Sequence, residues 1–195
     1  MLRLVIFDLD GTVVEQKINF AALRSEIGAP KGKPILEYIE SLPEKARPPA
    51  LKILHRHEET AARNCSLQPG LLDILEFLRK RGLVVAVFTR NSRASLRTVL
   101  ERHHITFDAE ATREDAPPKP SPEPVLFLCQ RLAVKPSETL VVGDYEFDIA
   151  SGHAAGARTV HLVSELHPST TTPSDYKIRS LDELRPIVER LIRAS

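Results

Sequence analysis

The sequence is poor in cysteine and has no long apolar run. Its two cysteines, Cys65 and Cys129, lack the paired spacing of a metal site or a disulfide framework, so we expect buried thiols in a reducing compartment. No apolar run approaches the length of a membrane-spanning helix. Met1 leads almost directly into the apolar run 4–7, which leaves no room for a signal peptide. These absences predict a cytoplasmic protein without a membrane partner.

An excess of charge of one sign is also missing. The formal net charge is +1, which gives no reason to expect nucleic acid or an acidic membrane surface as the main partner. Of the 195 residues 42% are hydrophobic, enough for one core with a small inserted subdomain. The oligomeric state is left open by the sequence.

Apolar runs rich in β-branched residues alternate with helical patterns. The runs are continuous, as in parallel strands covered on both faces, and this alternation predicts a doubly wound α/β sheet. We expect strands at 2–7, 83–88, 139–142 and 158–163, with a short extra strand at 107–110. We expect helices at 69–81, 92–103 and 122–133, and a last helix after the capping box at 180–183, running to about residue 193.

Residues 16–67 break this alternation. No strand pattern is visible there, and helical periodicity appears at 18–27, 34–42 and 50–64. We therefore expect a helical cap at 16–67, inserted into a Rossmann-like core made of 1–15 and 68–195. Ligands of such sheets bind outside the carboxyl ends of the strands, and the insertion leaves from one of those ends. Five basic residues could face a ligand from this cap, and the sequence does not distinguish among them: Lys17, Arg24, Lys31, Lys33 and Arg47.

The first strand ends in two carboxylates. If the chain stays extended, Asp8 and Asp10 point to one side, so that one could attack a phosphorus atom and the other could move protons. We expect Asp8 as nucleophile and Asp10 as acid and base, with the backbone N–H groups at Gly11 facing an anion. The alternative for this short motif alone is an acidic turn after a strand.

A hydroxyl and a cation follow later in the chain. Thr89 stands directly after a strand, where its hydroxyl and the N–H of Arg90 can hold a phosphoryl oxygen. Lys119 lies in a segment with five prolines at 117–124, which makes a stiff loop. A rigid cation beside phosphate neutralises developing charge without reorganising. Taken singly, Thr89 also fits a helix N-cap and Lys119 a polyproline surface loop.

A third strand leads into another acidic pair. Asp144 can ligate a hard cation, and Asp148 falls one turn later if a helix has begun. Mg²⁺ fits because it takes one or two protein carboxylates together with substrate phosphate. We expect Asp8, Asp10, Asp144 and Asp148 to surround the ion. Alone, Asp148 also fits an acid of the first helical turn.

The ordered set of these motifs resembles the haloacid dehalogenase superfamily of aspartate-nucleophile phosphatases. The resemblance implies that Asp8 is the nucleophile, that Asp10 is the acid and base and ligates Mg²⁺ through its backbone carbonyl, and that Asp148 supports the metal ligand Asp144. It also implies that Thr89 and Lys119 bind phosphate. Dehalogenases of the superfamily lack an aspartate at the position of Asp10, which disfavours that activity.

The cap is similar to that of phosphoglycolate-phosphatase-like members, although it is short. The sequence therefore predicts a Mg²⁺-dependent phosphatase that acts on a small phosphorylated metabolite. Two alternatives remain open: a phosphomutase of the same superfamily, and a non-catalytic module that binds phosphorylated ligands.

Overall fold

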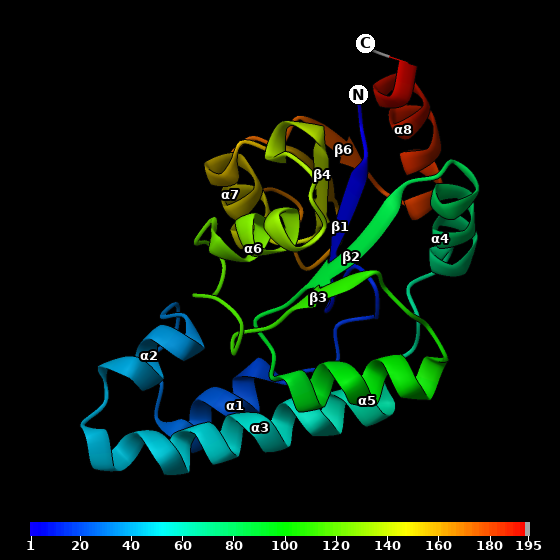
Figure 1. Cartoon of the computed structure of the whole chain (residues 1–195). Helices are drawn as coiled ribbons and strands as arrows, with labels where there is room; N and C mark the ends of the chain where they lie inside the picture. Colours follow the sequence, from blue (N-terminus) through cyan, green and yellow to red (C-terminus); the bar gives the residue numbers. More distant parts are fainter. Residues whose placement is uncertain (194–195) are drawn as a thin grey trace.

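The core is a six-stranded, entirely parallel sheet in the order β3-β2-β1-β4-β5-β6. The computed structural model describes residues 1–193 (Figure 1). The strands are β1 (Leu4–Asp8), β2 (Val84–Phe88), β3 (Ala109–Ala111), β4 (Thr139–Gly143), β5 (Arg158–Leu162) and β6 (Tyr176–Ile178). This confirms the predicted doubly wound α/β fold.

Five helices cover the two faces of the sheet. They are α4 (Leu71–Lys80), α5 (Arg93–His103), α6 (Glu123–Arg131), α7 (Glu146–Ala155) and α8 (Leu184–Arg193). Apolar residues of α4, α5 and α8 pack with Val5 and Phe7 of β1, whereas those of α6 pack with Leu4 and Ile6 on the opposite face. Neighbouring residues of β1 are therefore both buried, which explains the continuous apolar run in the sequence.

The sheet has its topological switch point at β1. The chain runs from β1 to β2 and β3 on one side, and then returns to β4 on the other side of β1. In register, Asp8 lies beside Phe88, so β1 and β2 end at the same level. Sheets of this kind bind ligands at the carboxyl ends of the strands beside such a switch point. The predicted site residues of β1, β2 and β4 all follow these ends.

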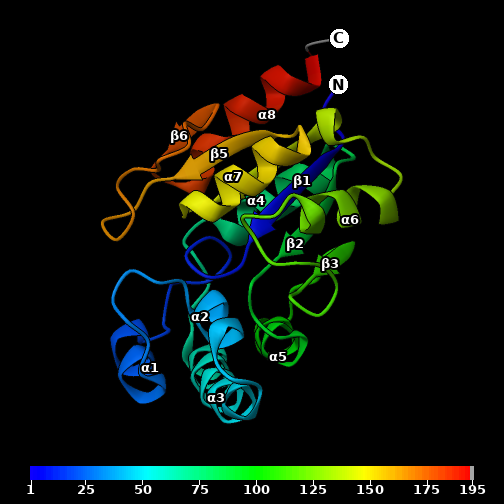
Figure 2. The same ribbon diagram turned by 90° about the vertical axis from the view of Figure 1, so that its left-hand side faces the viewer.

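The insertion is helical and lies beyond the carboxyl ends of the strands (Figure 2). It contains α1 (Phe20–Ile27), α2 (Ile35–Ser41), a 3₁₀ turn (Glu44–Ala46) and α3 (Arg47–Asn64). The three helices share a small apolar cluster of their own. Helix α3 also packs along the core helix α5 (Figures 1 and 2). The division into two domains at residues 15 and 68 stays a prediction.

Three elements differ most from the sequence-based expectation. Helix α3 begins at Arg47 and not at Ala50, because Pro48 lies in its first turn, where a missing N–H costs nothing. Strand β6, next to a polar loop, was not expected, and helix α7 (Glu146–Ala155) was considered only as a condition for the position of Asp148. Among the helices of residues 1–193, none combines the length and apolar character that a membrane crossing requires.

Candidate active site

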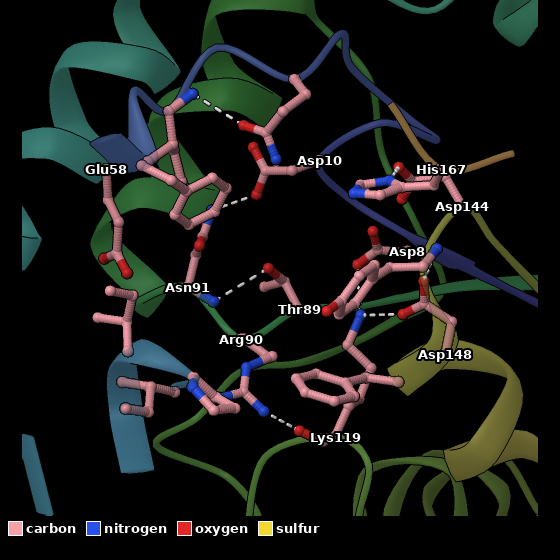
Figure 3. A pocket seen from close by; sticks show the side chains of 18 of the residues that line it. Asp8, Asp10, Glu58, Thr89, Arg90, Asn91, Lys119, Asp144, Asp148 and His167 are labelled. Atoms are coloured by element: carbon pink, nitrogen blue, oxygen red, sulfur yellow. Dashed lines mark hydrogen bonds and ion pairs between the residues drawn. The ribbon is translucent and has the colours of Figure 1, made fainter. Parts of the chain in front are cut away.

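The carboxyl ends of β1, β2 and β4 meet the insertion at one cavity of about 320 Å³ (Figure 3). A volume of this size lies at the small end of ligand pockets and suits a small metabolite. Seven of the eight predicted site residues line it, from four separate segments of the chain: Asp8, Asp10, Thr89, Arg90, Lys119, Asp144 and Asp148. The eighth, Gly11, has a φ of 93°, and a Cβ there would overlap the Asp144 carboxylate. Gly11 therefore allows the turn after β1 to pass close to β4.

Lys119 is a buried cation between two buried carboxylates. Its Nζ donates to Asp8 and, at 2.6 Å, to Asp148, and it lies 4.0 Å from the centre of the Phe88 ring. Burial alone would lower the pKa of Lys119, but the charges of Asp148 and Asp8 outweigh burial and raise it. Lys119 is therefore held as an ammonium group next to the predicted nucleophile.

The carboxylates of Asp8, Asp144 and Asp148 form a cluster whose oxygens lie within 4.8 Å of one another. Both oxygens of Asp148 already have partners, Nζ of Lys119 and, at 3.0 Å, the N–H of Tyr145. Within residues 1–193, Oδ2 of Asp8 and Oδ1 of Asp144 make no hydrogen bond. These two oxygens suit a hard divalent cation, whereas Asp148 is better placed to orient Lys119 and to cap α7.

Burial raises the pKa values of three carboxyl groups in this cavity, those of Asp8, Asp10 and Asp148. For Asp8, burial is the largest cause, the charge of Asp148 adds to it and that of Lys119 opposes it. For Asp10, burial raises the pKa to about 6, while a hydrogen bond from the Asn91 amide to Oδ2, at 2.6 Å, opposes the rise. A carboxyl group with a pKa near 6 can both give and take a proton close to neutral pH.

The turn after β2 presents unused donors to the cavity. The Thr89 hydroxyl oxygen accepts the N–H of Asn91 at 3.0 Å, which leaves its own O–H free to donate. The N–H of Arg90 makes no hydrogen bond within residues 1–193. The Arg90 side chain points elsewhere, because it pairs with Glu37 of α2 at 2.7 and 2.8 Å and donates to the carbonyl of Lys119. Only the backbone of Arg90 is thus available to a phosphoryl oxygen.

Among the residues that line the cavity without having been predicted from the sequence are Asn91, Glu58 and His167, and Glu58 is paired with Arg113 outside the lining. Asn91 could have been found, since it follows Thr89 by two residues at a strand end. Glu58 is one of two neighbouring acids on α3, beside Glu59, and the sequence does not single it out. His167 lies in the loop after β5, where its Nδ1 is 2.7 Å from Oδ2 of Asp144, and this hydrogen bond raises the pKa of His167.

The cap contributes a mostly apolar wall and one cation. Of its five basic candidates, only Arg24 lines the cavity. Nη1 of Arg24 donates to the carbonyls of Pro30 at 3.0 Å and Lys33 at 2.6 Å, so that its side chain is fixed. The apolar part of the wall consists of Ile18, Phe20, Pro34, Ile35, Leu36 and Leu54.

Comparisons with known proteins agree with this geometry. A family model described as haloacid dehalogenase-like hydrolase matches residues 5–162. An uncharacterized hydrolase of Saccharomyces cerevisiae is 33% identical over 205 residues, covering 100% of this chain and 94% of that protein. A phosphoglycolate phosphatase of Haemophilus influenzae is 29% identical over 192 residues, covering 82% and 85%. The solved structure of a predicted phosphoglycolate phosphatase from Haemophilus somnus has a TM-score of 0.74 at 21% identity, covering 96% and 98%, and shows the same fold.

Proposed function

The chain belongs to the haloacid dehalogenase-like hydrolase family, and we propose that it is a Mg²⁺-dependent phosphatase of a small phosphorylated metabolite. The observation that carries this proposal is the position of Asp8 in the cavity, between Lys119 and the free oxygen of Asp144. A nucleophile, a cation and a hard-metal ligand thus face the same small volume. The phosphoglycolate phosphatase relative supports a phosphomonoester as substrate.

In the first half of the reaction, Asp8 attacks phosphorus and displaces the leaving alkoxide. Asp10 gives its proton to that oxygen, for which a pKa of about 6 is suitable. The hydroxyl of Thr89, the N–H of Arg90 and the ammonium group of Lys119 stabilise the charge on the phosphoryl oxygens. A Mg²⁺ ion held by Asp8 and Asp144 would neutralise further phosphate charge.

In the second half, water hydrolyses the aspartyl-phosphate on Asp8. Asp10, now ionised, takes a proton from that water, and the P–O bond to Asp8 breaks to release inorganic phosphate. The same carboxyl group thus acts as acid and then as base. Release of phosphate to water separates this reaction from that of a phosphomutase, which returns the phosphoryl group to the substrate.

Phosphate release from a panel of phosphorylated metabolites, with Mg²⁺ and with chelator, tests the proposal. Asp8→Asn keeps the shape of the side chain and removes the nucleophile, so it should abolish turnover without unfolding the protein. A phosphate label that hydroxylamine removes should be trapped on Asp8 during turnover of the wild type. Label on another residue, or a near-normal rate in Asp8→Asn, would falsify the proposed mechanism.

A further inference from the structure

The four-residue segment 89–92, between β2 and α5, carries two of the four predicted phosphate-binding residues, Thr89 and Arg90. It provides the Thr89 hydroxyl, the N–H of Arg90 and the Asn91 amide that binds Asp10. A loop of this length does not hold its peptide groups in one orientation by itself. Its shape depends on the groups that hydrogen-bond to it from other parts of the chain.

A buried ion pair lies directly behind this segment. Glu58 comes from α3 of the insertion and Arg113 from the loop after β3, and their side chains are 2% and 9% exposed. Nη1 and Nη2 of Arg113 donate to the two carboxylate oxygens of Glu58 at 2.5 and 3.0 Å. The pair is bidentate, which fixes both side chains in one relative orientation.

The ion pair also binds the backbone of the segment. Nη1 of Arg113 donates to the Arg90 carbonyl at 2.8 Å, and the N–H of Arg113 donates to the Asn91 carbonyl at 3.4 Å. The N–H of Ser92 donates to Oε2 of Glu58 at 3.3 Å. The paired side chains therefore hold Arg90 and Ser92, and the backbone of Arg113 holds Asn91. Glu58 itself lines the cavity beside Asn91 (Figure 3).

We propose that Glu58 is a positioning residue of the active site, which through Arg113 and Ser92 fixes the segment that presents Thr89 and Asn91. This inference rests on the proposed phosphatase function. A buried ion pair gives no more stability than well-packed apolar side chains of similar volume. Apolar side chains could neither donate a hydrogen bond to the Arg90 carbonyl nor accept one from the Ser92 N–H, whereas this ion pair does both. The insertion is thus part of the phosphate-binding apparatus as well as a wall of the cavity.

The test compares Glu58→Gln with Glu59→Gln, its neighbour on α3. Glu59 is exposed and contacts Arg63 on the same helix, so its removal should leave kinetics unchanged. Glu58→Gln places an NH₂ group against the donors of Arg113 or Ser92 and should disturb the segment. With p-nitrophenyl phosphate as substrate, we expect kcat to fall about 10- to 100-fold, as for small displacements of positioned groups, while KM changes less than about threefold.

Two further measurements separate positioning from folding. Arg113→Lys keeps the charge but lacks the planar group that binds Glu58 and the Arg90 carbonyl together, so it should repeat the loss in kcat. If Glu58→Gln does not fold, Arg113→Lys decides the question. Orthovanadate resembles the five-coordinate transition state, and its Ki should rise by the factor by which kcat/KM falls.

Three results would overturn the inference at temperatures where the variants are folded. They are a kcat within twofold of wild type in Glu58→Gln, a wild-type kcat in Arg113→Lys, and a fall in kcat with an unchanged orthovanadate Ki. A wild type that releases no phosphate from any ester would instead refute the proposed function, and this inference with it.

Discussion

Replacing Asp144 by asparagine should abolish turnover without loss of stability in chelator. Asp144 belongs to a buried cluster with Asp8 and Asp148. Within residues 1–193, Lys119 is the one cation that contacts Asp8 and Asp148, and His167 contacts Asp144. Even with His167 protonated, the three carboxylates outnumber the two cations and leave an excess of negative charge in a small volume. Removal of one carboxylate relieves repulsion and removes a metal ligand at the same time.

The magnitude follows from the spacing of the cluster. The ligand oxygens lie within 4.8 Å of one another, and two unit charges near that separation repel by about 3.5 kcal/mol at an effective dielectric of 20, or about 0.9 kcal/mol in water. Lys119 cancels part of this repulsion. Weakening of the hydrogen bond between Asp144 and His167 acts in the opposite direction, and bonds to charged groups contribute about 1.5 to 3 kcal/mol. We expect a net gain of about 0 to 2 kcal/mol, which raises Tm by about 0 to 8 °C.

In chelator Asp144→Asn should have the higher Tm, and in excess Mg²⁺ the wild type should have the higher Tm. An ion that binds only the folded state at 100 times its Kd adds about 2.7 kcal/mol. In a chain of this size that stabilisation raises Tm by about 5 to 11 °C. The wild type should show this rise, and Asp144→Asn should show little of it.

Thermal melting of both proteins in chelator and in excess Mg²⁺ measures these differences. Glu146→Gln is the matched control, because Glu146 lies two residues further on, contacts Thr171 and is outside the cluster. It should keep the full response to Mg²⁺. A wild type whose Tm does not change with Mg²⁺ would refute the reasoning. So would an Asp144→Asn protein that has a lower Tm than the wild type in chelator and yet shows the same rise in Tm with Mg²⁺.

Two further predictions concern the other groups of the site. Lys119→Ala should lower kcat at least about a hundredfold, since one preorganised charge contact contributes about 2.7 to 4 kcal/mol in the transition state. Lys119→Arg should not restore kcat fully, because the planar guanidinium differs in shape from an ammonium group. A change in kcat below threefold in Lys119→Ala, measured where chemistry limits the rate, would place Lys119 outside the site. Asn91→Ala removes the hydrogen bond that favours ionised Asp10, so the pKa of Asp10 should rise above about 6. Because the first step needs protonated Asp10, the alkaline limb of kcat/KM against pH should move to higher pH, and an unmoved or lowered limb would contradict the assignment.

The alternation of apolar runs and helical patterns was sufficient to predict the core, because both patterns are local. A continuous β-branched run needs only its own residues to be recognised, and the boundaries of β2, β4 and β5 differ from prediction by one residue at most. Asp8, Thr89 and Asp144 could be grouped for the same reason, since each follows a strand and parallel strands end at one edge. The catalytic roles of these residues stay predictions.

Long-range packing decided the rest of the site. The bond between Asn91 and Asp10 joins residues 81 positions apart, and the pair of Glu58 and Arg113 spans 55 positions. Neither has a sequence pattern, because the face of α3 that reaches the core depends on how α3 packs against α5.

The sequence by itself determined five of the six strands, the order of the motifs and the residues at the strand ends, through periodicities that span a few neighbouring positions. Only the tertiary structure showed that Arg24 is the cap cation at the cavity and that both oxygens of Asp148 already have partners. It also showed that Glu58 hydrogen-bonds to the segment 89–92. These facts depend on where separate elements meet in space, which is set by the packing of whole helices and loops and not by the residues next to each site in the chain.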